Sequence, residues 1–199
     1  MGLSKLEAVN IILDGIGETP VSSLDSGLPD AEAAETKLNE IHKTVLSKGW
    51  HQNTEKNLKL IPDTNKNILV PATYLRVDTT QSSKATNVSV RKLNNNFMLY
   101  DVINQSYEFE NDLFCDVIML LDFEDLTLEL SNYIAYRAAR KFQEAQMQSA
   151  ALDNFTVRAE MEAYAALMDS ECENEDSNIL LDNAHCFYAT HRNHTLSGR

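Results

Sequence analysis

Residues 4–50 read SKLEAVNIILDGIGETPVSSLDSGLPDAEAAETKLNEIHKTVLSKGW, and this stretch predicts two amphipathic helices joined by a short loop. Ser4 followed by Glu7 is the pattern of a capping box, in which each residue satisfies a free backbone donor at a helix N-terminus. Gly17 suits the left-handed conformation that ends a helix, and Pro20 prevents the chain from continuing one. The apolar residues between them share one face at three- and four-residue steps: Leu6, Val9, Leu13 and Ile16, with Ile12 beside them.

The second helix carries a single apolar stripe behind Asp30, which we predict as its N-cap. Gly49 is expected at the left-handed position after the last turn, and Trp50 is expected to fold back over Val45. The stripe steps by three and four residues: Ala31, Ala34, Leu38, Ile41 and Val45. Such a hairpin needs further elements against which to bury these faces.

Residues 54–121 lose helical periodicity and are rich in Asn, Thr, Ser and β-branched residues, which favours strands. The strand candidates are 58–60, 68–70, 74–78, 88–90, 97–100 and 117–121. A run of three asparagines, Asn94 to Asn96, suits the positive φ angles of a tight hairpin turn. We therefore expect a small, mostly antiparallel sheet inserted between helices.

Helical signals resume at Asp122, where Asp122, Glu124 and Asp125 crowd the expected N-terminus of a long third helix. A fourth helix is expected from Asp153 or Asn154, fraying over 169–176. Its stripe is Val157, Met161, Tyr164 and Leu167 or Met168. The predicted fold is thus α+β: an α-helical bundle of about four helices, with an inserted, mostly antiparallel β-domain and an extended C-terminal arm. The expected division is a helical hairpin (1–53), the β-domain (54–121), the C-terminal helices (122–176) and the arm (177–199).

The net charge of −13 argues against a protein that binds nucleic acid tightly through its phosphates. It does not exclude a protein past which nucleic acid moves without being bound. Nine acids and no Lys or Arg occur between Asp101 and Glu129, whereas Lys56 and six further cations face two Asp between 56 and 93. These blocks could set the register of neighbouring copies, or they could simply be solvated. The chain has no apolar run of membrane-spanning length, and its start does not resemble a secretory signal. Three cysteines without a CxxC spacing favour a reduced, intracellular origin.

No catalytic signature or phosphate-binding loop is present in the sequence, and six glycines leave little material for one. The arm contains imidazole and thiol groups that could ligate zinc: His185, Cys186, His191 and His194. It lacks the recurrent paired spacing of closed zinc sites, so we expect no metal and no cofactor, and incidental histidines instead.

Several segments, in order along the chain, resemble the tail tubular protein A family, the head-to-tail adaptors of short-tailed phages. The most specific match covers residues 8–13 and 16–24, and especially the loop around Gly17 and Pro20. The others are residues 38–39, 41, 47–50, 60–63, 122–126, 133–134, 138–140 and 142. The chain departs from the family at Thr127, where a proline is frequent, and along the arm after Asp182.

This resemblance implies a structural virion protein at the head–tail junction, made and assembled in the bacterial host cytoplasm. It implies a dodecameric ring that joins the portal protein to the tubular nozzle protein (tail tubular protein B), with DNA passing through its channel without sequence specificity. No enzymatic activity and no membrane contact are implied. An acidic channel would repel the phosphate backbone and so let DNA slide.

We expect two sets of residues to matter in such an assembly. Structural or subunit-interface candidates are Gly17, Pro20, Gly49, Trp50, Lys84, Arg91, Lys92, Asp122, Glu124 and Asp125. Portal-contact candidates in the arm are Phe187, Tyr188, Arg192 and Arg199. Two alternatives stay open from the sequence: a virion-associated hydrolase of cell-envelope peptidoglycan or polysaccharide, motivated by the many carboxylates, and a nucleic-acid binder, motivated by the basic stretch.

Overall fold

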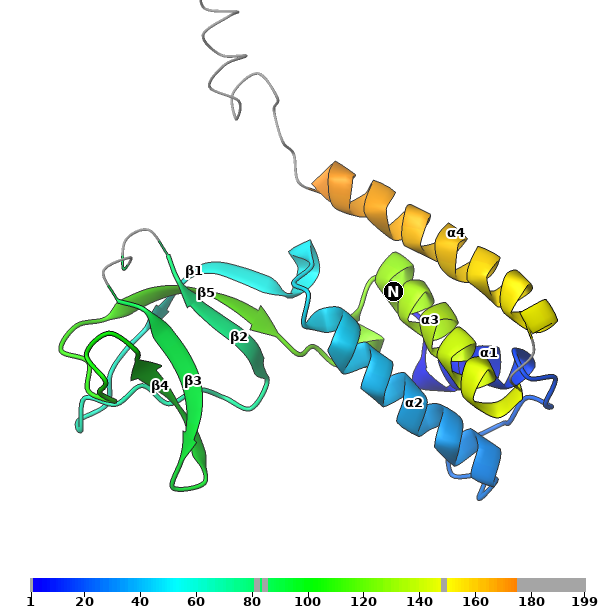
Figure 1. Ribbon diagram of the computed structural model, residues 1–199, viewed down its shortest axis with the longest axis horizontal. Coiled ribbons are helices and arrows are strands. Elements are labelled where there is room, and N and C mark those ends of the chain that lie inside the picture. Colours follow the sequence, from blue (N-terminus) through cyan, green and yellow to red (C-terminus); the bar gives the residue numbers. More distant parts are fainter. Residues whose placement is uncertain (1, 81–82, 84–85, 148–149, 175–199) are drawn as a thin grey trace, which may run out of the picture.

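The computed structural model describes residues 2–80, 83, 86–147 and 150–174, with only the backbone described for 150–155. Four helices and two antiparallel sheets make up these residues, which confirms the predicted α+β class (Figure 1). The helices are α1 (Lys5–Asp14), α2 (Pro29–Leu46), α3 (Leu128–Met147) and α4 (Ala150–Asn174), with short 3-10 turns η1 (His51–Asn53) and η3 (Phe123–Asp125). The strands are β1 (Thr54–Leu60), β2 (Tyr74–Thr79), β3 (Val88–Leu93), β4 (Asn96–Asp101) and β5 (Leu113–Met119).

The ends of α1 follow from its local sequence. Ser4 Oγ accepts a hydrogen bond from the Glu7 backbone N–H, while Glu7 Oε2 accepts one from the Ser4 N–H, so the predicted capping box is confirmed. Gly17 has a φ of +79°. The N–H groups of Gly17 and Glu18 donate to the carbonyls of Asp14 and Leu13, which completes a Schellman motif.

Two predicted helix starts are wrong. The N-cap of α2 is Leu28, not Asp30, because Pro29 occupies the first helical position, where its fixed φ is favourable and its missing N–H costs nothing. Asp30 lies in the first turn, where its charge complements the helix dipole. The helix expected from Asp122 is interrupted, since Leu126 is extended after η3, and α3 begins only at Leu128.

The β part forms two sheets rather than the single one expected. The first has the strand order β1-β5-β2, and the second is the β3–β4 hairpin. All paired strands are antiparallel, and the hairpin turns through Asn94 and Asn95 at φ values of 47° and 68°, as predicted from the asparagine run. Residues 68–70 do not form a full strand, because only Leu69 makes a bridge, to Met98.

Buried apolar side chains form two clusters, one among the helices and one in the β part. The α2 stripe lies entirely in the first cluster, together with Trp50 and the inward faces of α1 and α3. The second cluster comprises Ile68, Val70, Val77, Leu99, Phe109, Leu113, Cys115 and Val117. Burial raises the pKa of the Cys115 thiol to about 11, so this cysteine is a core residue and not a reactive one.

Helix α4 is longer than predicted, and only part of its predicted apolar stripe faces the bundle. It packs against α3 on the outside of the bundle (Figure 1). Among the α4 residues whose side chains the structure describes, Glu160 and Leu167 are buried, at 8% and 1% exposure. Met161, Tyr164 and Met168 are instead 65%, 41% and 37% exposed. Leu167, an alternative member of the predicted stripe, therefore points inward, and Val157 is half-buried, whereas Met161, Tyr164 and Met168 lie on the surface.

Among the described residues, no helix is both long and apolar enough to cross a bilayer.

Candidate interaction surfaces

The joint between the helical and β parts is held by Asn53, which is fully buried. Its Nδ2 donates to the Leu46 carbonyl at the end of α2 (2.9 Å) and to the Met119 carbonyl at the end of β5 (2.7 Å). Its Oδ1 accepts from the backbone N–H of Trp50 (2.8 Å). One side chain thus ties together the two chain segments that pass between the parts.

Gln52 makes a second link across the same joint. Its Nε2 donates to the Asp125 carbonyl and its Oε1 accepts from the Thr127 N–H. A proline at position 127, as is frequent in the family that the sequence resembles, would lack that N–H. Asp122, Glu124 and Asp125, three of the interface candidates, therefore lie in and before η3 at this joint rather than inside a helix.

Gly49 and Trp50 close α2 as predicted, with an addition that the sequence did not suggest. Gly49 has a φ of +81°, and a Cβ there would lie 2.6 Å from Cδ1 of Ile118 in β5. The Trp50 indole Nε1 donates to the Val45 carbonyl at 2.9 Å, the bond that a backbone N–H makes in a Schellman motif. Both residues therefore stabilise the subunit from within, since Trp50 is only 8% exposed.

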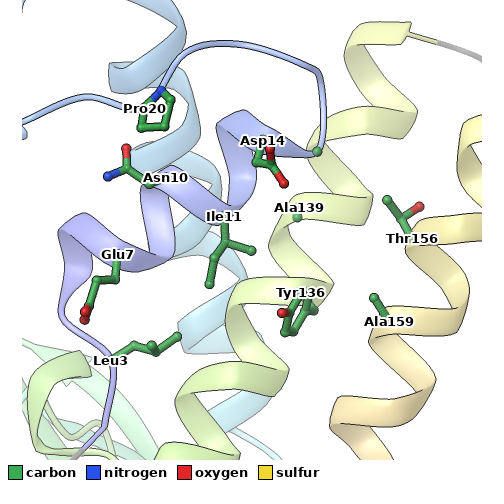
Figure 2. Close-up of a pocket in the computed structure, with 11 residues that line it drawn as sticks. Leu3, Glu7, Asn10, Ile11, Asp14, Pro20, Tyr136, Ala139, Thr156 and Ala159 are labelled. Atoms are coloured by element: carbon green, nitrogen blue, oxygen red, sulfur yellow. The ribbon is translucent and has the colours of Figure 1, made fainter.

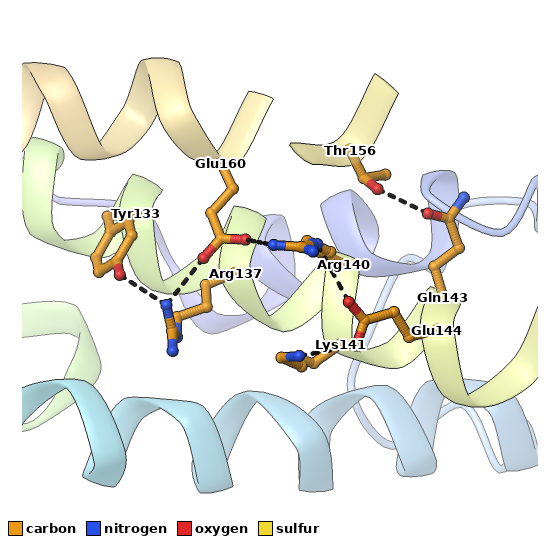
Figure 3. Close-up of polar contacts among 8 residues, drawn as sticks. All are labelled: Tyr133, Arg137, Arg140, Lys141, Gln143, Glu144, Thr156 and Glu160. Carbon is orange, nitrogen blue, oxygen red and sulfur yellow. Dashed lines mark hydrogen bonds and ion pairs between the residues drawn. The ribbon is translucent and has the colours of Figure 1, made fainter. Parts of the chain in front are cut away.

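Ion pairs fasten α4 to α3 (Figure 3). Glu160 accepts from Arg137 Nη1 at 2.9 Å and from Arg140 Nη1 at 3.0 Å, and its side chain is 11% exposed. Arg137 also donates to the Tyr133 hydroxyl, and burial raises the pKa of this tyrosine, so the phenol is neutral and can accept. The polar contacts therefore determine which face of α4 points inward.

An apolar groove of about 550 Å³ opens between α1, α3 and α4 (Figure 2). Ile11 of α1 and Tyr136 of α3 line it from one side, and Ala159 of α4 lines the other. Its charged residues are Glu7 and Asp14, both acidic. Pro20, an interface candidate, also lines this groove, and the next residue, Val21, is held to α1 by two hydrogen bonds with Asn10.

A second groove, of about 300 Å³, continues the first one along α4. The two share Tyr136 and Ala159. The second adds Leu128, Ala163 and Ala166, and its charged residues are Glu129 and Glu162. We call the combined feature the acidic groove, since its lining contains four carboxylates and no Lys or Arg.

The other sequence candidates are distributed as follows. Arg91 lies over the Tyr100 ring at 3.6 Å and Lys92 over the Phe97 ring at 5.9 Å, both on the β3–β4 hairpin. Elsewhere in the β part the basic and acidic blocks meet within the subunit, in the pairs Lys59–Asp112 and Lys66–Glu110. Part of the charge pattern therefore serves the fold of one copy rather than contact between copies.

Several candidates lie outside the described residues: Lys84, the arm residues Phe187, Tyr188, Arg192 and Arg199, and the histidines and Cys186 considered for zinc. Within the part of the chain that the structure describes, no group of three His, Cys, Asp or Glu side chains is arranged to hold a metal ion. Sequence reasoning missed Asn53, Gln52 and Glu160, whose importance depends on partners distant in the chain.

Comparison with known proteins defines the class to which this fold belongs. A family model described as tail tubular protein matches residues 6–177, and the chain belongs to this family of structural phage tail proteins. It is similar to Tail tubular protein A of Klebsiella phage KP34, with 29% identity over 134 residues, covering 67% of this chain and 68% of that protein. The chain is therefore a component of the virion tail and of its assembly with other tail proteins.

Proposed function

We propose that the protein forms a dodecameric ring adaptor that joins the portal to the tubular nozzle protein and encloses part of the DNA ejection channel. The name of the similar Klebsiella phage protein, Tail tubular protein A, supports a place in the tubular tail. The observation that carries the adaptor role is the joint at Asn53 and Gln52, which fixes two separately packed parts relative to each other. An adaptor needs such a fixed arrangement of its two parts, because its two ends bind different partners at a fixed spacing.

In this proposal the helical part forms the ring body and the β part meets the nozzle protein. Three large apolar side chains of the β part are exposed and available for such a contact: Ile61 at 66%, Leu69 at 56% and Ile103 at 61%. The arm, residues 177–199, would reach the portal through Phe187, Tyr188, Arg192 and Arg199.

The net charge of −13 suits a wall along which DNA moves. Phosphates are repelled by carboxylates, so DNA would neither bind tightly nor require sequence contacts. Assembly would take place in the host cytoplasm before the tail is complete, with no membrane partner.

The test is to purify the full chain and the portal protein of the same phage and to determine their combined mass by native mass spectrometry. We expect twelve copies of the chain on one portal, whereas a monomer in the absence of portal agrees with the proposal. Deletion of residues 177–199 should leave the melting curve unchanged and abolish portal binding. A full chain that never joins the portal under any condition refutes the adaptor role.

A further inference from the structure

Three large apolar side chains share one flank of α4 and are 37–65% exposed, although one of them, Tyr164, also packs against Tyr133 of α3 with 5.2 Å between the ring centroids. We call Met161, Tyr164 and Met168 the α4 ridge. A surface helix normally turns its apolar stripe toward its own core, and here the ion pairs of Glu160 occupy that side instead. Rotating α4 to bury the ridge would take Glu160 away from Arg137 and Arg140. The ridge is therefore held outward by the rest of the fold.

The ridge and the acidic groove lie on opposite flanks of α4. Ala159, Glu162 and Ala166 line the groove at positions i, i+3 and i+7, and the ridge residues have the same spacing two residues later. Two residues correspond to about 200° around an α-helix. Each flank extends over seven residues, or about 10 Å at 1.5 Å per residue. An exposed apolar stripe and a groove lining of similar length thus lie on opposite flanks of α4.

The charges on the two flanks are complementary. Met161 and Tyr164 line a cleft whose charged residues are Lys48, Arg137 and Arg140 against the single carboxylate of Glu160, and Glu144 outside this lining also pairs with Arg140. The groove on the other flank has four carboxylates and no cation. In a chain with 30 acids and 17 Lys or Arg, this excess of cations beside the most exposed apolar stripe of the bundle favours an acidic partner surface.

We propose that the α4 ridge of one copy seats in the acidic groove of the next copy. Two different faces on opposite sides of one subunit give a head-to-tail contact, the kind that closes into a ring when the rotation between copies allows it. The ridge supplies the apolar contact, and Lys48 beside it faces the groove carboxylates of the neighbour. This inference rests on the proposed ring and specifies which surfaces build it.

Two variants separate the two faces. The ridge-blocked variant, Met161→Glu with Met168→Glu, places carboxylates where the neighbour's groove is acidic. The groove-blocked variant, Asp14→Lys with Ala166→Arg, fills the groove and changes its charge at two exposed positions. Met161→Leu with Met168→Leu is the matched control, because it keeps the ridge apolar. Circular dichroism melting of each variant verifies that the subunit still folds.

Assembly on the portal is measured for each protein by native mass spectrometry. Wild type and the Leu control should form rings, and each blocked variant should lose ring formation at least tenfold. Wild-type rings are also assembled on the portal from an equimolar mixture of 14N and 15N chains and treated with a zero-length amine-to-carboxylate cross-linker. Mixed-isotope cross-links should join Lys48 of one copy to Glu7, Asp14, Glu129 or Glu162 of the other copy.

The results distinguish a failure of the proposed contact between copies from a failure of the proposed ring. If wild type forms rings and either folded, blocked variant does so equally well, the two faces are not the contact, while the ring stands. Mixed-isotope cross-links of Lys48 only to other carboxylates also overturn the inference. If wild type forms no ring on the portal, the ring and this contact fail together.

Discussion

Replacement of Asn53 by alanine tests the joint on which the adaptor role depends. The substitution removes three hydrogen bonds of 2.7–2.9 Å at a position with no solvent exposure. Each buried hydrogen bond contributes about 1 kcal/mol, and an orphaned buried donor or acceptor costs about 1–3 kcal/mol. Because the bonds to the Leu46 carbonyl and the Trp50 N–H are buried and the bond to the Met119 carbonyl is partly buried, we expect a loss of about 3–4 kcal/mol.

The assay is urea and thermal unfolding followed by circular dichroism. For a chain of this length 1 kcal/mol corresponds to about 2–4 °C, so Asn53→Ala should lower the Tm by about 10 °C. Asn53→Asp should be at least as harmful, because it loses both donors and points a carboxylate at two carbonyl oxygens. Asn39→Ala, on the half-buried side of α2, is the matched control and should change the Tm by less than about 2 °C. A Tm of Asn53→Ala equal to that of the control, or Asn53→Asp more stable than Asn53→Ala, refutes the reasoning.

Four further changes test other parts of the account. Trp50→Ala should destabilise the subunit by about 3–4 kcal/mol, through a lost buried ring and a lost bond to a helix carbonyl; an unchanged urea midpoint contradicts this. Glu160→Ala should cost about 2 kcal/mol, because two partly buried arginines lose their partner, and Glu160→Gln should recover part of the loss in the same titration. Reversing Arg91 and Lys92 to Glu should impair ring formation more than the monomer's free energy of unfolding, which we expect to fall by about 1 kcal/mol or less; equal loss of both would indicate a folding role. Burial lowers the pKa of His42, so the unfolded chain binds a proton more readily than the folded chain does. The stability that this group contributes is therefore present above its ordinary pKa of about 6.5, and it is lost as the pH falls through the lower pKa of the folded state. Unfolding curves between pH 7 and 5 should be less steeply pH-dependent for His42→Leu than for wild type, and identical slopes would show that the histidine is not responsible.

Local chemistry made the helix ends and the hairpin turn predictable. A capping box, a glycine after a helix and a run of asparagines each act within a few residues, and the positive φ values of Gly17, Gly49 and Asn94 follow from them. The starts of α2 and α3 were less predictable, because Pro29 and the buried turn at Phe123 compete with equally plausible acidic caps.

The orientation of α4 could not be predicted from its own periodicity. Spacing shows that Met161, Tyr164 and Met168 share a flank, but it does not show which way that flank points. The orientation of α4 depends on Arg137 and Arg140, about twenty residues earlier in the chain, which form ion pairs with Glu160 on the inward side. The joint between the helical and β parts likewise could not be predicted from local spacing.

Asn53 is one asparagine among many in this chain, and its role becomes visible only when the ends of α2 and β5 are brought together around it. The two sheets differ from the single one expected for a related reason. Alternating hydrophobicity identifies strands, whereas the order in which they pair depends on contacts across the whole β part.

Electron cryomicroscopy of the complete virion tests the central claim most directly. We predict a ring of twelve copies between the portal and the tubular nozzle, with the helical parts forming the ring body, the β parts toward the nozzle, and DNA in the enclosed channel. Density that places this chain away from the head–tail junction, or at the junction without a closed ring, would contradict it.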